Sequence, residues 1–136
     1  MVDRKKVLVV DDSFVMRTVI KNLVAADPEL EVVGEAANGE EALARAKVLK
    51  PDVVLLDIEM PVMSGLDCMK RLRLVSRAKV VIISSVAQMG SPESLQARSL
   101  GAADIIAKPS GAMSLDLGEK KGHEIVKAAR KAAGLS

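Results

Sequence analysis

Two short apolar runs in this chain end directly in aspartates, and this pattern strongly constrains the fold. Residues 7–10 (VLVV) run into Asp11 and Asp12, and residues 53–56 (VVLL) run into Asp57. Such runs are typical of strands that are buried on both faces of a sheet. Carboxylates beside such a core are costly unless something compensates their charge. If the two strands are parallel neighbours, the three carboxylates raise one another's pKa values and attract a divalent cation.

Strand and helix patterns alternate along the chain. The strand-like runs cover residues 6–10, 31–36, 53–56, 79–83 and 104–107. Helical patterns lie between them, with capping residues at Ser13, Asn38 and Ser91. This alternation predicts an α/β fold with a doubly wound, five-stranded parallel sheet and five helices. Residues 110–118 are expected to be irregular, with the last helix after them.

Length and composition favour a single domain spanning residues 1–136, with residues 1–5 as a frayed end. The chain is 49% hydrophobic with a net charge of +2, whereas a nucleic-acid-binding domain is usually far more basic. It has one cysteine, Cys68, and one aromatic residue, Phe14. It shows neither a signal segment nor an apolar stretch of roughly 20 residues that could cross a bilayer. We therefore expect a cytoplasmic protein without membrane insertion.

Polar residues also follow two other apolar runs. Ser84 follows VVII and Lys108 follows DIIA, whereas the second run ends at Glu35 and Ala36, to which we assign no role. In open parallel sheets, ligands bind beyond the carboxyl ends of the strands. We therefore expect Ser84 and Lys108 to lie at the same edge as the three aspartates.

This set of residues suits phosphoryl transfer. A carboxylate can act as the nucleophile, and Asp57, which stands alone after its strand, is the natural choice. Asp11 and Asp12 are the natural ligands of Mg²⁺, which prefers a few carboxylates and several waters. Lys108 supplies a point charge to a phosphate oxygen, and the hydroxyl of Ser84 donates a hydrogen bond.

The segments that carry these residues resemble the receiver domains of two-component response regulators. The matching motifs are VLVVDDS (7–13), PDVVLLDIEMPVMSGLD (51–67), VVIISS (80–85) and the pair Lys108-Pro109. The resemblance implies a flavodoxin-like or CheY-like sheet of strand order 2-1-3-4-5. It also implies that the domain takes a phosphoryl group from a sensor histidine kinase and then changes its surface around the fourth helix, fifth strand and fifth helix.

The resemblance also assigns roles to individual residues. Asp57 becomes the phosphoacceptor and a ligand of Mg²⁺, beside the acidic pair Asp11 and Asp12 and the main-chain carbonyl of Glu59. Ser84 becomes the switch hydroxyl. Lys108 becomes the phosphate-contacting lysine, and the bond between Lys108 and Pro109 becomes a candidate cis peptide.

Within the family, the chain is most similar to chemotaxis receivers. DDSFVMR (11–17), DIEMPVMSGLD (57–67) and KPSGAMSLDL (108–117) resemble the receiver half of the chemotaxis methylesterases. The esterase half is not in this sequence, so the only chemistry expected is self-catalysed phosphorylation and autodephosphorylation. The chain is then either a stand-alone receiver, with an output target such as the flagellar motor, or half of a methylesterase, with its own effector domain as target.

Three positions depart from the family pattern or stand out within it. Ile105 lies where the family often has Tyr or Phe, so an aromatic ring cannot carry the signal outwards. Glu59 follows the phosphoacceptor by two residues, and we hypothesise that its side chain reaches the metal or its waters when no phosphoryl group is present. Residues 110–118 form either a partner-binding loop or a packed loop tethered by Leu115 and Leu117.

Three other functions use similar features. A flavin carrier needs aromatic residues and a phosphate-binding first loop, which Asp11 and Asp12 contradict in charge. A phosphatase with an aspartate nucleophile typically needs a second aspartate two residues on, where this chain has Glu59. A degenerate receiver that acts only as a scaffold would not need the full residue set.

Overall fold

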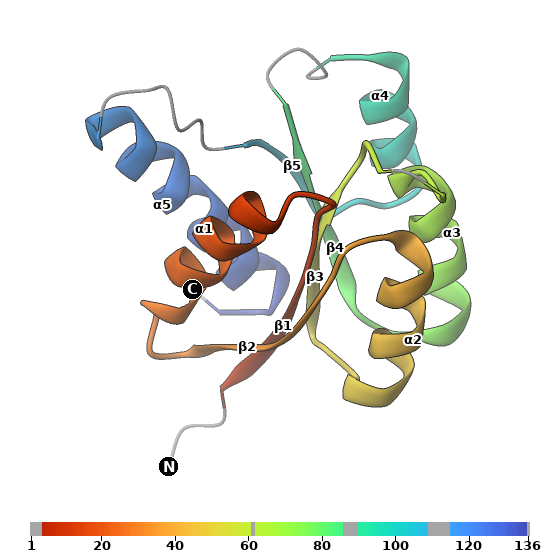
Figure 1. Cartoon of the computed structure of the whole chain (residues 1–136), viewed down its shortest axis with the longest axis horizontal. Coiled ribbons are helices and arrows are strands. Elements are labelled where there is room, and N and C mark those ends of the chain that lie inside the picture. Colours follow the sequence, from red (N-terminus) through yellow and green to blue (C-terminus); the bar gives the residue numbers. More distant parts are fainter. Residues whose placement is uncertain (1–3, 61, 86–89, 109–114, 136) are drawn as a thin grey trace.

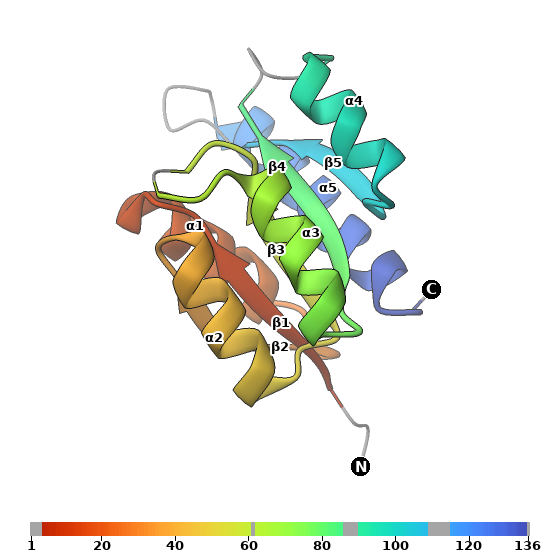
Figure 2. The same ribbon diagram turned by 90° about the vertical axis from the view of Figure 1, so that its right-hand side faces the viewer.

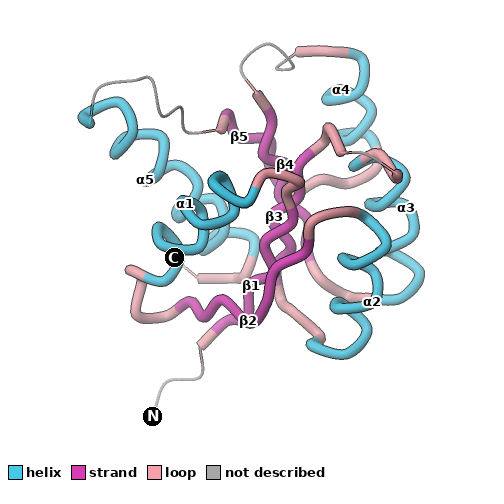
Figure 3. The backbone as a smooth tube through the Cα atoms, viewed as in Figure 1, coloured by secondary structure: helices cyan, strands magenta, loops and turns pink. Residues whose placement is uncertain are grey.

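The structure, a computed structural model, describes residues 4–60, 62–85, 90–108 and 115–135, with only the backbone at 115–121. Strands and helices alternate as the sequence predicts (Figure 3). The elements are β1 (Lys5–Val10), α1 (Phe14–Ala25), β2 (Leu30–Ala36), α2 (Gly39–Leu49), β3 (Val53–Asp57), α3 (Gly65–Val75), β4 (Lys79–Ser84), α4 (Pro92–Ser99), β5 (Asp104–Ala107) and α5 (Leu115–Ala132).

The five strands form one parallel sheet in the order β2-β1-β3-β4-β5, which confirms the predicted doubly wound fold. Figure 1 shows α1 and α5 on one face of the sheet and α2, α3 and α4 on the other, and Figure 2 shows the second face from the front. Each face has its own apolar core because successive side chains of a strand point to opposite faces. Ile20 and Ile125 pack on the first face, and Met69 and Leu72 on the second.

The helix starts predicted from capping residues are confirmed. The side chains of Ser13, Asn38 and Ser91 accept hydrogen bonds from main-chain N–H groups in the first turns of α1, α2 and α4. Ser64 does the same for α3. These caps fix where each helix leaves its loop, and the loops before α1, α3 and α4 lie at the carboxyl edge of the sheet.

The ends of the chain differ in part from the sequence-based expectation. β1 begins at Lys5, whose N–H donates to the carbonyl of Glu29 at 2.9 Å, so the expected frayed end is too long by this residue. The last helix begins at Leu115, so the irregular stretch expected up to residue 118 was wrong for its last four residues. The remainder of that stretch and the candidate cis bond before Pro109 lie outside the described residues.

The early start of α5 goes against local helix propensity, because the helix contains two glycines, Gly118 and Gly122. At Gly122 the reason is tertiary packing. A Cβ atom there would lie 2.6 Å from Cδ2 of Leu23, so glycine lets α5 pack on α1 without a shift of the Leu23 side chain. In the part of the chain that the structure describes, no helix combines the length and apolarity needed to cross a membrane.

Candidate functional site

Three aspartates meet at the carboxyl edge of the sheet. β1 and β3 are paired neighbours, with Val10 opposite Leu56, so Asp11 and Asp57 follow at the same level. Asp11 and Asp57 are buried, whereas Asp12 is exposed. One carboxylate oxygen from each of the three lies within 4.8 Å of the others. The structure therefore brings together the three aspartates that the sequence predicts at one edge.

Lys108, directly after β5, faces two of these aspartates. Its Nζ lies 3.0 Å from Oδ2 of Asp11 and 3.1 Å from Oδ2 of Asp57. Both oxygens are fully buried, and neither accepts a hydrogen bond of good geometry from any described residue. The contact with Lys108 is thus an ion pair without well-directed hydrogen bonds. It leaves coordination sites on both oxygens unused.

Burial first, and then the nearby charge of Asp11, raise the pKa of Asp57, which reaches about 6. The ammonium of Lys108 and the N–H of Glu59, which donates to Oδ1 at 3.1 Å, act in the opposite direction but do not cancel the shift. For Lys108 itself, burial lowers the pKa, but the charges of Asp57 and Asp11 outweigh it, and its pKa is raised. Asp57 is therefore still mostly ionised at neutral pH but at a cost to the fold.

The loop between β3 and α3 closes over one side of the site. Gly65 donates its N–H to the carbonyl of Ile58 at 3.0 Å, and a Cβ atom at Gly65 would lie 2.4 Å from the main-chain oxygen of Asp57. Only glycine permits this close approach of two backbone segments. The loop thereby holds Glu59 beside Asp57.

An open cavity of about 750 Å³ lies over these residues. Its lining residues come from the end of β3 and from the segments that follow β1, β3, β4 and β5. They are Asp12, Asp57, Ile58, Glu59, Met60, Ser64, Glu93 and Lys108. Glu93 was missed as a site residue because its place in the first turn of α4 marks it only as a helix-start acid. No pattern along the chain would have shown that α4 brings it to the cavity.

Ser84 is at the predicted strand end but does not line the cavity. It is the last residue of β4, is fully buried, and its hydroxyl donates to the main-chain oxygen of Ser85 at 3.3 Å. Its own carbonyl accepts from the N–H of Lys108 at 2.7 Å, which joins the ends of β4 and β5. Ser84 and Lys108 are thus coupled through the backbone.

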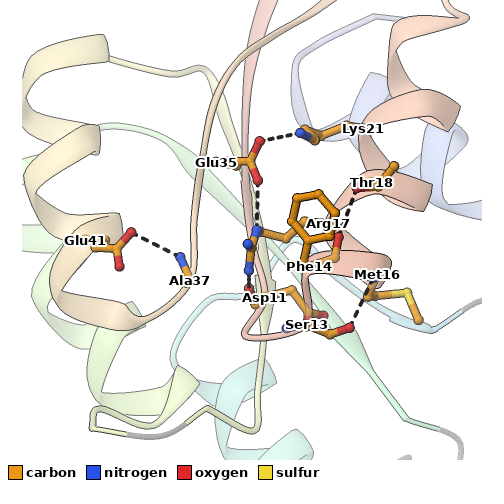
Figure 4. Close-up of polar contacts among 10 residues, drawn as sticks. All are labelled: Asp11, Ser13, Phe14, Met16, Arg17, Thr18, Lys21, Glu35, Ala37 and Glu41. Atoms are coloured by element: carbon orange, nitrogen blue, oxygen red, sulfur yellow. Dashed lines mark hydrogen bonds and ion pairs between the residues drawn. The ribbon is translucent and has the colours of Figure 1, made fainter.

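Sequence reasoning also missed the role of Glu35 at the end of β2. Glu35 forms ion pairs with Arg17 and Lys21 of α1 (Figure 4). Those hydrogen bonds, from Lys21 first and then from Arg17, lower the pKa of Glu35. The spacing of Arg17 and Lys21 by one helical turn was visible in the sequence, but their common partner was not.

These residues fit a divalent cation. Three carboxylates face one ammonium, so the cluster has an excess of negative charge, and two buried oxygens have no hydrogen-bond partner among the described residues. All the available ligands are hard oxygens, which suit Mg²⁺. Asp11, Asp12 and Asp57 could hold such an ion.

Comparison with known proteins assigns the family. Residues 7–118 match the response regulator receiver domain. The chain belongs to the response regulator receiver family. Receiver domains typically bind Mg²⁺ in an acidic pocket and are phosphorylated there. The family membership and the fold that the motifs implied are thus confirmed.

Several similar proteins are of the chemotaxis type. The chain is 50% identical over 133 residues to protein-glutamate methylesterase/protein-glutamine glutaminase 1 of Syntrophomonas wolfei, a match that covers 98% of this chain and 38% of that protein. It superposes on the response regulator domain of Thermotoga maritima CheB with a TM-score of 0.85, 37% identity and 98% coverage of both chains. The chain spans about a third of the length of the curated methylesterases that it matches.

A second similar structure is the crystal structure of the P1 domain of CheA3 in complex with CheY6 from R. sphaeroides. The matching chain has a TM-score of 0.79 and 40% identity, with coverage of 97% of this receiver and 98% of that chain. The likeness therefore extends both to a methylesterase receiver domain and to a chain of this CheA3–CheY6 complex.

Proposed function

We propose that this receiver accepts a phosphoryl group on Asp57 from the phosphohistidine of a sensor kinase of the chemotaxis type. The observation that carries the proposal is the meeting of Asp57, Asp11 and Lys108 at one strand edge, with Oδ2 of each aspartate buried and without a hydrogen-bond partner among the described residues. Such an arrangement lowers the stability of the isolated domain, and an incoming cation and phosphoryl group would compensate it.

In the proposed reaction, a carboxylate oxygen of Asp57 attacks the phosphorus atom. A P–O bond forms to Asp57 while the P–N bond to the kinase histidine breaks, and the imidazole leaves with the electron pair of that bond. Lys108 lies 3.1 Å from Oδ2 of Asp57 and would stabilise negative charge on the transferred group. Asp11, Asp12, Asp57 and the main-chain carbonyl of Glu59 would hold Mg²⁺, which neutralises charge on the phosphoryl oxygens.

Ser84 would then act as the switch. Its hydroxyl is held by the carbonyl of Ser85 and would turn towards the new phosphoryl oxygens. Because the carbonyl of Ser84 accepts from the N–H of Lys108, this movement would reach the start of the segment after β5. Ile105 is buried in the apolar core beside β4, so the outward signal would pass through backbone and packing changes, not through an aromatic ring.

The output has two candidates. A stand-alone receiver would bind a target such as the flagellar motor. The receiver half of a methylesterase would regulate its own effector domain, and the 50% identity to such a protein over 98% of this chain favours this second candidate. In either case, the methyl-ester hydrolysis of the relatives would need a domain other than this one. Sequencing the natural gene beyond Ser136 distinguishes the two candidates.

Phosphorylation can be tested by intact-mass analysis after treatment with acetyl phosphate and Mg²⁺. We expect the wild-type protein to gain one phosphoryl group and D57N to gain none. D52N is a matched control, since Asp52 is an exposed aspartate at the opposite end of the sheet. A wild-type protein that neither gains mass nor binds beryllofluoride would favour the scaffold function instead.

The side chain of Glu59 is a second element of the proposal. Its N–H donates to Asp57 and the residue lines the cavity, which supports a role for its carboxylate in contacting the metal or its waters. E59A should therefore change the Mg²⁺ affinity and the half-life of the phosphoryl group. If both stay at their wild-type values, Glu59 has no such role.

A further inference from the structure

Arg17 of α1 links the ends of two strands beside the acidic site. Its Nε donates to Oε1 of Glu35 at 2.8 Å, and its Nη1 donates to the main-chain oxygen of Asp11 at 2.7 Å (Figure 4). Its side chain is only 12% exposed. A guanidinium can make two well-directed contacts in different directions because its donors lie in a rigid plane. Cζ of Arg17 lies over the ring of Phe14, 5.7 Å from the ring centroid.

The contact with Arg17 completes the fixation of Asp11. The N–H of Asp11 donates to the carbonyl of Ala36 at 3.1 Å, and its Oδ1 accepts from the N–H of Ser13 at 2.8 Å. With its main-chain oxygen held by Arg17, Asp11 has three anchored atoms. Its remaining oxygen, Oδ2, is the one that faces Lys108. The direction of this carboxylate oxygen thus depends on contacts outside the site.

Glu35 in turn holds Arg17. It is anchored in β2, and ion pairs with both Lys21 and Arg17 keep it ionised. Among the described residues, the polar contacts of the Lys21 side chain go to Glu35 alone, whereas the Arg17 side chain contacts both Glu35 and Asp11. Of these two basic residues, Arg17 therefore connects Glu35 to the acidic site, and Lys21 does not.

We propose that Arg17 is a positioning residue for the acidic site and that Glu35 orients it. The inference rests on the proposed phosphoacceptor function and extends it to a pair of residues beyond the metal ligands. Partners that orient metal ligands typically change metal affinity by about 10–100-fold when they are removed. Because Arg17 holds a main-chain oxygen of one ligand residue, we expect an effect at the lower end of this range.

The test compares R17K, E35Q and the matched control K21Q. R17K keeps the charge but loses the planar fork, so we expect about tenfold weaker Mg²⁺ affinity, measured by NMR titration of the folded proteins. E35Q should show a smaller loss in the same direction, and K21Q should stay within about twofold of the wild type. Thermal unfolding of each variant establishes the temperature at which all four proteins are fully folded.

Phosphorylation by acetyl phosphate supplies a readout that a merely structural role would not change. In R17K, the Mg²⁺ concentration for half-maximal rate should rise about tenfold while the rate at saturating Mg²⁺ stays near the wild-type value. Equal Mg²⁺ affinities in R17K, K21Q and the wild type would overturn the inference even if phosphorylation proceeds. If the wild type takes up no phosphoryl group but R17K still weakens Mg²⁺ binding, the positioning role stands and the phosphoacceptor proposal fails.

Discussion

At the amino end of the sheet, Asp52 joins two strand starts through ordinary hydrogen bonds. Its Oδ2 accepts from the N–H of Lys6 at 2.8 Å, and its carbonyl accepts from Lys79 at 3.0 Å. At the carboxyl end, Oδ2 of Asp11 and Oδ2 of Asp57 are buried with one ammonium between them and no well-directed hydrogen bond from the described residues. The same type of side chain thus stabilises one end of the sheet and destabilises the other.

The physical reason is solvation. An exposed carboxylate keeps its water and needs only a modest partner, whereas a buried one loses its water and needs full compensation. The raised pKa of Asp57 is the measure of that deficit, since burial is its main cause. A binding site for a cation and a phosphoryl group needs polar atoms that lack partners, because atoms with a full set of hydrogen bonds gain little free energy from a ligand.

The largest expected effect concerns Gly65, at the carboxyl end. G65A places a Cβ atom 2.4 Å from the main-chain oxygen of Asp57 and 2.6 Å from Cα of Ile58, so backbone must move. We expect a loss of about 3 kcal/mol in the free energy of unfolding, measured by urea titration. G34A is the matched control, because its Cβ would lie 2.7 Å from Cδ1 at the end of the Leu49 side chain and close to no backbone atom, so its loss should stay below about 1 kcal/mol. Equal losses would show that the loop backbone can yield.

The next effect is a gain in stability on removing a charge. In the absence of Mg²⁺, the free energy of unfolding of D57N should exceed that of the wild type by about 1–3 kcal/mol at about pH 7.5. The pKa of Asp57 is raised from 3.8 to about 6, so the wild type carries the full cost above the higher value and none below the lower one. The gain should therefore shrink as the pH falls through about 6 and vanish below 3.8.

Chemical unfolding across this pH range checks the gain. D52N is the control at the amino end, because asparagine keeps an oxygen acceptor for Lys6, and its stability should change by less than about 0.5 kcal/mol. A D57N variant that is less stable than the wild type at neutral pH would mean that the ion pair with Lys108 outweighs the cost of burial.

Mg²⁺ should offset part of the destabilisation that the buried aspartates cause at the carboxyl end of the sheet. At a concentration of about ten times its Kd, Mg²⁺ should stabilise the wild type by about 1.4 kcal/mol, and chelation should remove this gain. D12N removes a carboxylate from the cluster and should lose most of the gain, whereas D52N should keep it. An equal shift of the melting temperature in D12N and the wild type would place the cation elsewhere.

The smallest effect is expected for Arg130, near the amino end of the sheet. Arg130 pairs with Asp27 and Glu29 in the connection between α1 and β2. R130Q should lower the melting temperature only slightly, and added salt should reduce the difference, because ion pairs close to the surface are weak and screened. R73Q is a control with a main-chain partner, the carbonyl of Leu100, whose contribution should depend less on salt. A large, salt-independent loss in R130Q would contradict this comparison.

The fold could be predicted almost completely from the sequence. The apolar runs, the caps at Ser13, Asn38 and Ser91, and the strict alternation are local signals, and local signals survive in the structure when tertiary packing agrees with them. The last helix shows the limit. Gly118 and Gly122 oppose a helix locally, yet α5 begins at Leu115. Gly122 packs closely against Leu23, and about 100 residues separate these two residues in the chain.

The sequence alone placed Asp11, Asp12, Asp57 and Lys108 at the carboxyl edge, because a charged residue at the end of a buried strand has nowhere else to lie. The electrostatics of these residues come from the packing of the folded chain, which buries Asp57 and so raises its pKa, and which brings Lys108 close to two carboxylates. The link from Glu35 through Arg17 to Asp11 also comes from this packing. Distances between side chains from different elements depend on how the elements pack, and no periodicity along the chain encodes them.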